Sequence, residues 1–206
     1  MSIMQPRIYL ASQSPRRREL LKQIGVHFEL LLLRAYSPRR IDIDETPHPD
    51  EMPEAYVQRL SQEKAQLGFD TLSFRHLRPH PVLAADTTVT LDGRIFGKPA
   101  DAKQAADMLR ELSGREHRVL TAVAVAMDQR VEVLLSSSTV RFTKLSDERI
   151  RRYVQNHEYA DKAGGYAIQG QAGAFIEHIA GSYSGVMGLP LFETVQLLQR
   201  FDYPTP

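Results

Sequence analysis

Short apolar runs alternate with amphipathic stretches along the chain, and their periods predict strands and helices. Residues 8–10 are β-branched, aromatic and aliphatic, a pattern typical of a buried strand, and 28–33 predict a second buried strand. Between them Ser14 suits a helix N-cap and Pro15 suits the first helical position. The first part of the chain therefore predicts a strand that runs directly into a helix.

The rest of the chain continues this alternation. Further strands are predicted at 81–91, 94–97, 117–127, 130–142 and 173–180, and further helices at 52–67, 101–112, from Ser146, and from Pro190 to about Phe201. Polar, proline-bearing or glycine-rich segments predict loops at 34–51, 69–80, 161–171 and 181–188. Residues 92–93 and 128–129 predict tight turns, so hairpins accompany the strand-helix units. The expected fold class is α/β, a mixed sheet with flanking helices that the central hairpin can divide into two lobes around a cleft.

Composition narrows the function. The chain carries 26 Lys and Arg against 25 Asp and Glu, a net charge of +1, which argues against a nucleic-acid polymer as partner. The absence of Cys excludes disulfides, thiolate catalysis and zinc-thiolate sites, so any metal would be a hard cation held by carboxylates. No apolar run is long enough to span a membrane and no secretory leader is recognisable, so a cytoplasmic location without membrane attachment is expected.

The junction after the first predicted strand is suited to an anion. Backbone N–H groups at a helix N-terminus bind anions, and three arginines follow Pro15 with planar donors that match phosphate oxygens. A phosphate or polyphosphate ligand is therefore one hypothesis. A capped helix with a solvated basic face accounts for the same residues, and the stretch alone does not decide between them.

Carboxylates at two places are candidates for chemistry. Asp86 interrupts an otherwise apolar strand, where an unpaired charge is costly. The turn at 92–93 would return Lys98 alongside that strand, either as a structural ion pair with Asp86 or as a phosphate-binding lysine beside a catalytic carboxylate. The long segment 34–51 carries an acidic cluster next to two arginines, which is either a solvated charged loop or a functional one. The cluster consists of Asp42, Asp44 and Glu45, beside Arg39 and Arg40.

Five segments, in order and over essentially the whole chain, together resemble the Maf family of nucleoside triphosphate pyrophosphatases. They are SQSPRRREL from Ser12, IDE at 43–45, AADTTV at 84–89, GKP at 97–99 and YAIQGQAGAFIEHIAGSYSGVMGLPL at 166–191. The resemblance implies a Maf/Ham1-type, ITPase-like fold, in which a strongly bent sheet surrounds a deep cleft. It implies one domain, residues 1–206, with two lobes and no separable linker, usually found as a homodimer.

The resemblance also implies a reaction and its residues. The reaction is hydrolysis of a nucleoside triphosphate between the α and β phosphates, which gives a monophosphate and pyrophosphate with a divalent cation, Mg²⁺, Mn²⁺ or Co²⁺. Asp86 matches the carboxylate proposed to activate water, and Glu45 matches its partner in the metal site. The catalytic group implied by the resemblance is Asp86, Glu45, Lys98 and Gln169. The substrate-binding group is Ser12, Arg16, Arg17, Lys64 and Thr87, and the triphosphate contacts of the family match Arg17, Lys64 and Lys98.

Three positions separate two sister subfamilies, one resembling dTTP/UTP pyrophosphatases and one resembling 7-methyl-GTP pyrophosphatases. Trp, Gln and Glu would be typical of the methylguanine type, whereas this chain has Arg16, Thr87 and Gln169. A Gln side chain can complement the imide edge of uracil or thymine, while Trp and Glu would suit a stacked guanine. The resemblance therefore implies dTTP and UTP as substrates, with modified uridine and thymidine triphosphates as further candidates. The alternatives are a 7-methyl-GTP pyrophosphatase and a non-catalytic, nucleotide-sensing regulator of cell division.

Overall fold

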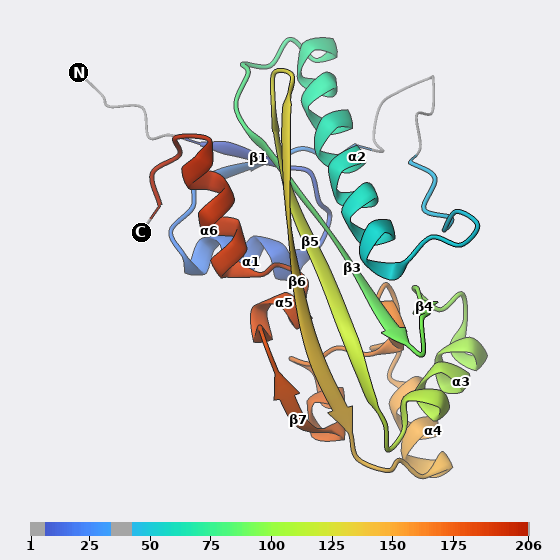
Figure 1. Cartoon of the computed structure of the whole chain (residues 1–206). Coiled ribbons are helices and arrows are strands. Elements are labelled where there is room, and N and C mark those ends of the chain that lie inside the picture. The colour runs from blue at the N-terminus through green and yellow to red at the C-terminus, as the bar shows by residue number, and fades with distance from the viewer. Residues whose placement is uncertain (1–6, 34–42, 206) are drawn as a thin grey trace.

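One mixed sheet organises the part of the chain that the structure describes. The computed structural model describes residues 7–33 and 43–205. Its seven-stranded sheet has the order β2-β1-β3-β5-β6-β7, with β4 paired to β3 (Figure 1). The strands are β1 (Ile8–Leu10), β2 (Phe28–Leu30), β3 (Val82–Leu91), β4 (Arg94–Phe96), β5 (Glu116–Met127), β6 (Arg130–Phe142) and β7 (Ile176–Ala180). β1 is parallel to β2 and β3 and the other pairs are antiparallel, which confirms the expected mixed α/β class.

Helices cover both faces of this sheet (Figure 1). They are α1 (Pro15–Gln23), α2 (Pro53–Phe74), α3 (Ala102–Leu112), α4 (Asp147–Gln155), α5 (Tyr183–Met187) and α6 (Leu191–Arg200). The side chains of β3 alternate between two cores, because successive residues of a strand point to opposite faces. Val82 and Ala84 share a core with Ala65 and Leu72 of α2. Leu83 and Ala85 share the other core with the leucines of α1 and α6, Leu20, Leu21, Leu197 and Leu198.

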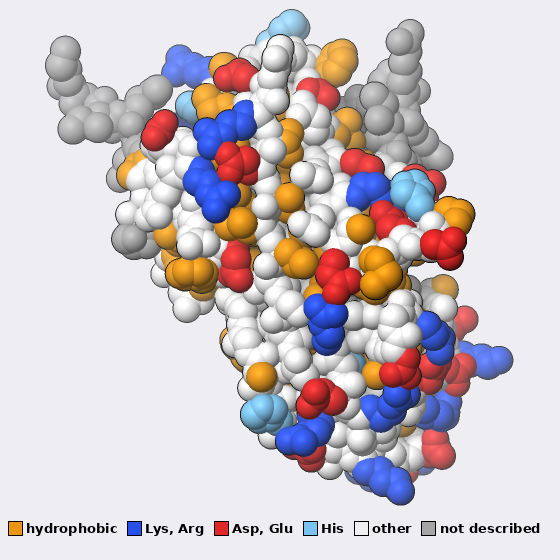
Figure 2. All heavy atoms as spheres, viewed as in Figure 1, with side chains coloured by type: hydrophobic (Ala, Val, Ile, Leu, Met, Phe, Trp, Pro, Cys, Tyr) orange, Lys and Arg blue, Asp and Glu red, His pale blue; other side chains and the backbone are white. Residues whose placement is uncertain are grey.

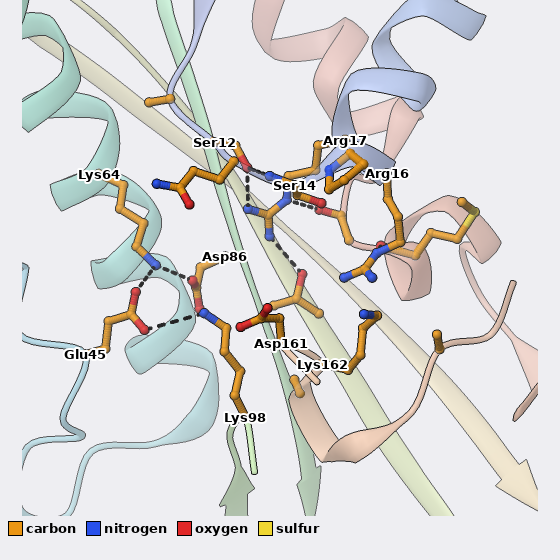
Figure 3. A pocket seen from close by; sticks show the side chains of 18 of the residues that line it. Ser12, Ser14, Arg16, Arg17, Glu45, Lys64, Asp86, Lys98, Asp161 and Lys162 are labelled. Carbon is orange, nitrogen blue, oxygen red and sulfur yellow. Dashed lines mark hydrogen bonds and ion pairs between the residues drawn. The ribbon is translucent and has the colours of Figure 1, made fainter. Parts of the chain in front are cut away.

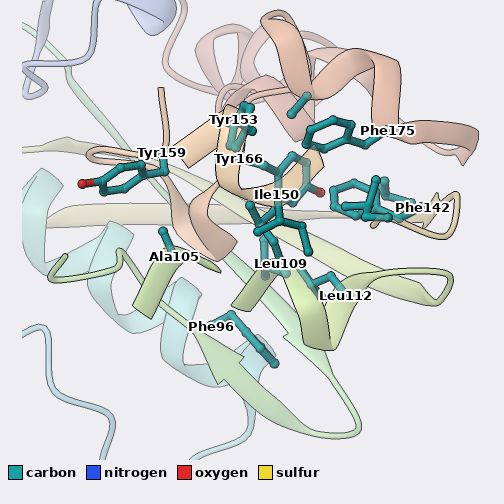
Figure 4. Close-up of a cluster of buried hydrophobic side chains, with 14 of the residues drawn as sticks. Phe96, Ala105, Leu109, Leu112, Phe142, Ile150, Tyr153, Tyr159, Tyr166 and Phe175 are labelled. Carbon is teal, nitrogen blue, oxygen red and sulfur yellow. The ribbon is translucent and has the colours of Figure 1, made fainter. Parts of the chain in front are cut away.

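A third core lies at the far end of the sheet, where α3 and α4 pack (Figure 4). Its aromatic side chains meet edge to face: the ring centroids of Phe142 and Tyr166 are 4.8 Å apart, and those of Tyr153 and Phe175 are 5.2 Å apart. Such pairs add about 0.5–1.5 kcal/mol beyond their buried area. The core therefore fixes the segment around Tyr166, which lies between α4 and β7 in the sequence.

Four segments differ from the sequence-based expectations. Only Phe28–Leu30 of the strand expected at 28–33 is a strand, and it is not fully buried, since β2 is the edge strand and Leu30 is 44% exposed. The loop expected at 69–80 begins later, because α2 continues to Phe74. The strand expected at 173–180 begins at Ile176, after a 3-10 turn at Gln171–Phe175. The loop expected at 181–188 contains α5, whose N-cap Ser182 accepts a hydrogen bond from the Gly185 amide at 3.0 Å.

On the face that Figure 2 shows, Lys and Arg side chains lie among Asp and Glu side chains, so no large patch of one charge sign is seen there. This agrees with the net charge of +1. Among the helices of residues 7–33 and 43–205, none is long and apolar enough to cross a membrane.

Candidate active site

A cavity of about 540 Å³ opens where the C-terminal end of β1 and the N-terminus of α1 meet the middle of α2, the middle of β3 and the segment after α4 (Figure 3). All nine residues assigned to catalysis or substrate binding by the resemblance line it: Ser12, Arg16, Arg17, Glu45, Lys64, Asp86, Thr87, Lys98 and Gln169. The expected acidic cluster is described only in part, because Asp42, Arg39 and Arg40 lie outside the described residues. Of its two described acidic members, Asp44 and Glu45, Glu45 lines the cavity.

The alternation along β3 sends Asp86 and Thr87 to different walls of the cavity. Asp86 follows Val82 and Ala84 on the face that α2 covers, and Thr87 follows Leu83 and Ala85 on the face of α1. Asp86 accordingly meets Lys64 of α2, and Thr87 meets Arg17 of α1. The neighbouring positions of one strand thus serve two chemically different walls.

The wall beside α2 joins two carboxylates through one lysine (Figure 3). The Lys64 ammonium Nζ lies 2.6 Å from Asp86 Oδ1 and 2.8 Å from Glu45 Oε1. The Lys64 and Asp86 side chains are 16% and 15% exposed, so the pair is largely shielded from water and its attraction is screened little. The Lys98 ammonium reaches Glu45 Oε2 at 3.8 Å. Asp86 is therefore paired with Lys64, and Lys98 is paired with Glu45. Of the two interpretations of Lys98, the structural ion pair with Asp86 is not found among the salt bridges of the described residues.

The backbone of Glu45 is held by a buried tyrosine. Tyr56 of α2 donates from its hydroxyl to the Glu45 carbonyl oxygen at 2.9 Å. Burial, together with the negative charges of Asp86 and Glu45, raises the pKa of Tyr56 to about 12. Tyr56 therefore stays protonated and keeps its donor at neutral pH, so the segment that carries Glu45 is tied to α2.

The same wall fits a hard divalent cation only as part of a larger ligand set. The described residues contain no group of three or more His, Cys, Asp or Glu that could hold a metal ion by themselves. Asp86 and Glu45 both contact one Lys64 nitrogen, so their oxygens lie close together. Mg²⁺ in proteins is commonly held by one or two carboxylates together with water and substrate phosphates. Two carboxylates facing a cavity match that pattern.

The opposite wall is built by the N-terminus of α1. Ser14 occupies the N-cap position and Pro15 begins the helix, as the sequence predicts. The Ser14 side chain makes no capping hydrogen bond, so the amide groups of the first turn have not been satisfied by a side-chain cap. Ser14, Pro15, Arg16 and Arg17 all line the cavity. A helix N-terminus and two guanidinium groups therefore face the same space.

Arg17 is fixed by neutral partners. Its Nε donates to the Gly188 carbonyl oxygen at 2.7 Å, and its two terminal nitrogens donate at 3.4 Å to the hydroxyls of Ser12 and Thr87. Burial lowers the pKa of the Arg17 guanidinium, and Asp86 acts in the opposite direction. The group remains charged, since arginine does not lose its proton in proteins. Neutral carbonyl and hydroxyl oxygens thus hold the positive charge of Arg17 beside the cavity.

A third wall comes from residues that the sequence treated only as a polar, glycine-rich loop. Asp161 and Lys162 line the cavity close to Arg16, whose Nε donates to the Met187 carbonyl oxygen at 3.2 Å. Burial and the nearby Arg16 charge lower the pKa of Lys162. The DKAGGY run was the available signal, because charged residues next to glycines in a long polar segment are common in binding loops.

The remaining predicted residue, Gln169, lies at the exposed rim of the cavity. It belongs to a turn that the Gly170 amide closes on the Ala167 carbonyl oxygen at 3.1 Å. Gln169 therefore contributes to the lining from an exposed position. The cavity as a whole has two carboxylates on one wall, cations on three sides and a neutral amide at the rim.

Comparison with known proteins identifies the family of the chain. Residues 7–201 match the family model described as Maf-like protein. Proteins called dTTP/UTP pyrophosphatase from Aromatoleum aromaticum and Nitrosospira multiformis are 58% and 56% identical to this chain, covering 99% and 97% of it and 100% and 97% of their own lengths. One from Chromobacterium violaceum is 50% identical over the full length of both chains. A solved structure, the Staphylococcus aureus Ham1 protein, aligns with 16% identity over 95% of this chain and 97% of its own, at a TM-score of 0.47. By the family model and by its near full-length relatives, the chain belongs to the Maf family.

Proposed function

We propose that this chain hydrolyses dTTP and UTP between the α and β phosphates, releasing the nucleoside monophosphate and pyrophosphate. The observation that carries the proposal is the cavity, in which the Lys64-bridged carboxylates face the cationic end of α1 across one space. Near full-length relatives called dTTP/UTP pyrophosphatase support the substrate class. The chain is accordingly a hydrolase of the Maf family.

In the proposed reaction Asp86 is the general base. It accepts a proton from a water molecule, whose oxygen attacks the α phosphorus as the bond from that phosphorus to the bridging oxygen breaks. Pyrophosphate leaves with the electrons of that bond. Arg17 and Lys98 stabilise negative charge on the phosphate oxygens. Lys64, which bridges the two carboxylates in the structure, also contacts the triphosphate. Ser12 holds Arg17 through its hydroxyl.

A divalent cation, Mg²⁺, Mn²⁺ or Co²⁺, is part of the proposal. Asp86 and Glu45 would hold it from the protein side, and phosphate oxygens and water would complete its ligand set. When bound, such a cation neutralises phosphate charge and polarises the phosphoryl group. Lys64 lies between the same two carboxylates, so it would share or yield their oxygens when the cation binds.

Base selection is proposed to rest on three residues that line the cavity, Arg16, Thr87 and Gln169. Gln169 offers both an acceptor and two donors from the rim, which complements the imide edge of uracil and thymine. The Thr87 hydroxyl also bonds to Arg17, so Thr87 connects the residues proposed to select the base with an arginine proposed to bind phosphate.

We propose further that residues 1–206 form one domain with two lobes. Support comes from the cavity lining, which combines Ala11 and Leu31 of the α2-side core with Val89 and Tyr166 of the α3–α4 core. The homodimer and the strongly bent, Ham1-type sheet implied by the resemblance stay predictions at this stage.

The test is a turnover assay with Mg²⁺ or Mn²⁺ and a panel of nucleoside triphosphates. We expect dTTP and UTP to give their monophosphates and one equivalent of pyrophosphate, faster than 7-methyl-GTP. Release of inorganic phosphate with a nucleoside diphosphate would contradict the bond assignment. Faster turnover of 7-methyl-GTP would assign the sister activity, and binding without turnover in any metal would favour the nucleotide-sensing regulator.

A further inference from the structure

Thr121 is a buried hydroxyl that the proposed reaction does not use. It lies in the middle of β5 and is 1% exposed, between the apolar neighbours Leu120 and Ala122. It does not line the cavity. A valine would fill the same space with equal preference for a strand and without a hydroxyl to satisfy, so burying threonine here requires hydrogen-bond partners.

Those partners form a continuous path from β5 to the cavity. Thr121 is the cross-strand neighbour of Thr87, and their hydroxyl oxygens are 3.0 Å apart. Thr87 Oγ1 lies 3.4 Å from Arg17 Nη2, and Thr121 Oγ1 lies 2.7 Å from the carbonyl oxygen of Gly185 in α5. Four groups from β5, β3, α1 and α5 are thereby joined in one chain of hydrogen bonds.

The chemistry of the end groups fixes the direction of every bond in this path. A carbonyl oxygen only accepts, so Thr121 must give its single proton to Gly185. Thr121 then accepts from Thr87, since the two hydroxyls are in contact. Thr87 has given its proton away, so the lone pairs of its oxygen are what remains for Arg17, and a guanidinium only donates. The path runs without conflict from Arg17 to Thr87, to Thr121 and to Gly185.

A second route joins Thr121 to the same arginine. Gly185 belongs to α5, whose C-cap is Gly188, and the Gly188 carbonyl oxygen accepts from Arg17 Nε at 2.7 Å. Gly188 has φ +115, and a Cβ there would come within 3.5 Å of Thr87 Oγ1 and 3.8 Å of Arg17 Nε. By holding α5 against β5, Thr121 holds the carbonyl that orients the other edge of the guanidinium.

We infer that Thr121 is a positioning residue for Arg17. It orients the Thr87 oxygen toward one edge of the guanidinium and fixes the α5 carbonyl at the other edge, so that Arg17 presents its charge to the substrate phosphates in one geometry. Because the half-buried Arg17 is held by neutral acceptors, its orientation depends on where these acceptors point. The inference rests on the proposed function only in that Arg17 meets phosphate oxygens.

The test uses three variants. Thr121→Val removes the hydroxyl at nearly unchanged volume, and Thr121→Ser keeps the hydroxyl but removes a methyl group. Thr88→Val is the matched control, because Thr88 is also 1% exposed on the adjacent strand and its hydroxyl has no hydrogen-bond partner in the structure. Loss of one oriented hydrogen bond is expected to lower kcat/KM for dTTP about tenfold in Thr121→Val. Thr121→Ser and Thr88→Val are expected to stay within about twofold of the parent protein.

A mutant cycle with Arg17→Lys separates positioning from general packing. Lysine keeps the charge but lacks the planar fork that Thr87 and Gly188 hold, so Thr121→Val is expected to have no further effect in the Arg17→Lys background. An equal loss in both backgrounds would overturn the inference, as would failure of Thr121→Ser to restore activity. Thr121→Ala replaces the valine variant in the same cycle if that variant does not fold, as judged by circular dichroism and thermal unfolding.

Calorimetric titration with inorganic pyrophosphate gives a readout that does not require turnover. Thr121→Val is expected to weaken pyrophosphate binding several-fold relative to Thr88→Val, and unchanged affinity would overturn the inference. If the parent protein does not hydrolyse dTTP, the proposed function fails, while the pyrophosphate comparison still decides the role of Thr121.

Discussion

Lys64 donates to both Asp86 and Glu45, so each of these side chains depends on the other two. Removing the charge of Asp86 while keeping its shape tests the assignment of the base. Asp86→Asn is expected to lower kcat by about 10² or more, the usual scale for loss of a general base, and to leave a folded protein. Steady-state kinetics with dTTP measures the first effect and thermal unfolding the second. Asp92→Asn, the same change at an exposed residue paired with Arg115, is the control, and near-normal kcat in Asp86→Asn would make Asp86 structural.

Gln169 allows a second prediction at the residue scale. Replacing it with Glu sets a negative charge against the carbonyl oxygens of uracil, and a site built on hydrogen bonds rejects a mismatched edge strongly. We expect Gln169→Glu to reduce kcat/KM for UTP with little gain for 7-methyl-GTP, and the triple variant with Arg16→Trp and Thr87→Gln to raise 7-methyl-GTP turnover. The kcat/KM ratios across the nucleotide panel decide the point. An equal loss for every nucleotide would mean that Gln169 serves the phosphates or water instead.

The sequence predicted residues whose chemistry is unusual for their surroundings. Asp86 could be found because a charge in an apolar strand needs a partner, and Arg17 because it follows Ser-Pro at a helix start. The partner of Asp86 was not predictable in the same way, because Lys64 reaches it only through the packing of α2 on β3. Thr121 gave no signal at all, since a threonine in a strand is ordinary and its role depends on α5 and α1.

At the scale of elements, the segment between α4 and β7 places the third wall of the cavity, and Gly164 anchors it. The Gly164 amide donates to the Gly97 carbonyl oxygen at 3.0 Å, next to Lys98. Gly164 has φ +67, and a Cβ would come within 2.9 Å of Val89 Cγ2. Gly164→Ala therefore meets both backbone strain and a clash, and it is expected to cost about 2–3 kcal/mol of unfolding free energy and to raise KM.

Chemical denaturation and steady-state kinetics check this prediction against a matched glycine. Gly93 has φ +77, but a Cβ there would meet nothing within 4 Å. Gly93→Ala should therefore show the conformational cost alone, about 1 kcal/mol, with unchanged KM. Equal losses in the two variants would mean that contact with Val89 does not position the segment.

The elements with clear periodicity were predicted well, and those defined by tertiary contacts were not. The helix at Ala102–Leu112 and the hairpin of β5 and β6 agree with the sequence closely. The end of α2 was placed too early because Gly68 resembles a helix stop, yet it lies inside α2 where a Cβ would come within 2.7 Å of Val82 Cγ1. This glycine serves the close approach of helix and sheet. α5 was missed because five residues carry too little periodicity to be recognised.

At the scale of the whole molecule, the cavity exists because the strands of one sheet contribute side chains to several hydrophobic cores. Residues of β3 reach α2 on one face and α1 and α6 on the other, and farther along they enter the core of α3 and α4. The mixed class followed from hairpin turns and strand-helix alternation. The way in which the segment after α4 folds back over β3 did not, because it depends on buried contacts such as Gly164 on Val89 rather than on a local pattern.

The core of α3 and α4 also makes global stability depend on pH through His117. Its imidazole is 2% exposed, Nε2 shares a 2.8 Å hydrogen bond with the Tyr166 hydroxyl, and burial lowers its pKa to about 4. In the unfolded chain the pKa of this histidine is near 6.5, so between pH 4 and pH 6.5 it binds more protons in the unfolded chain than in the folded protein. The contribution of neutral His117 to the free energy of unfolding is therefore complete above about pH 6.5 and is lost as pH falls towards 4. At about 1.4 kcal/mol per pKa unit, the difference between the two pKa values amounts to about 3 kcal/mol.

Urea unfolding at pH 7 and pH 5 tests this dependence. The parent protein should lose clearly more unfolding free energy at pH 5 than His117→Gln, whose amide can still bond Tyr166 but does not titrate. His178→Gln, at an exposed position on β7, is expected to behave like the parent protein. An unchanged pH dependence in His117→Gln would mean that other groups govern acid stability, and that the contact between His117 and Tyr166 tolerates a charged imidazole.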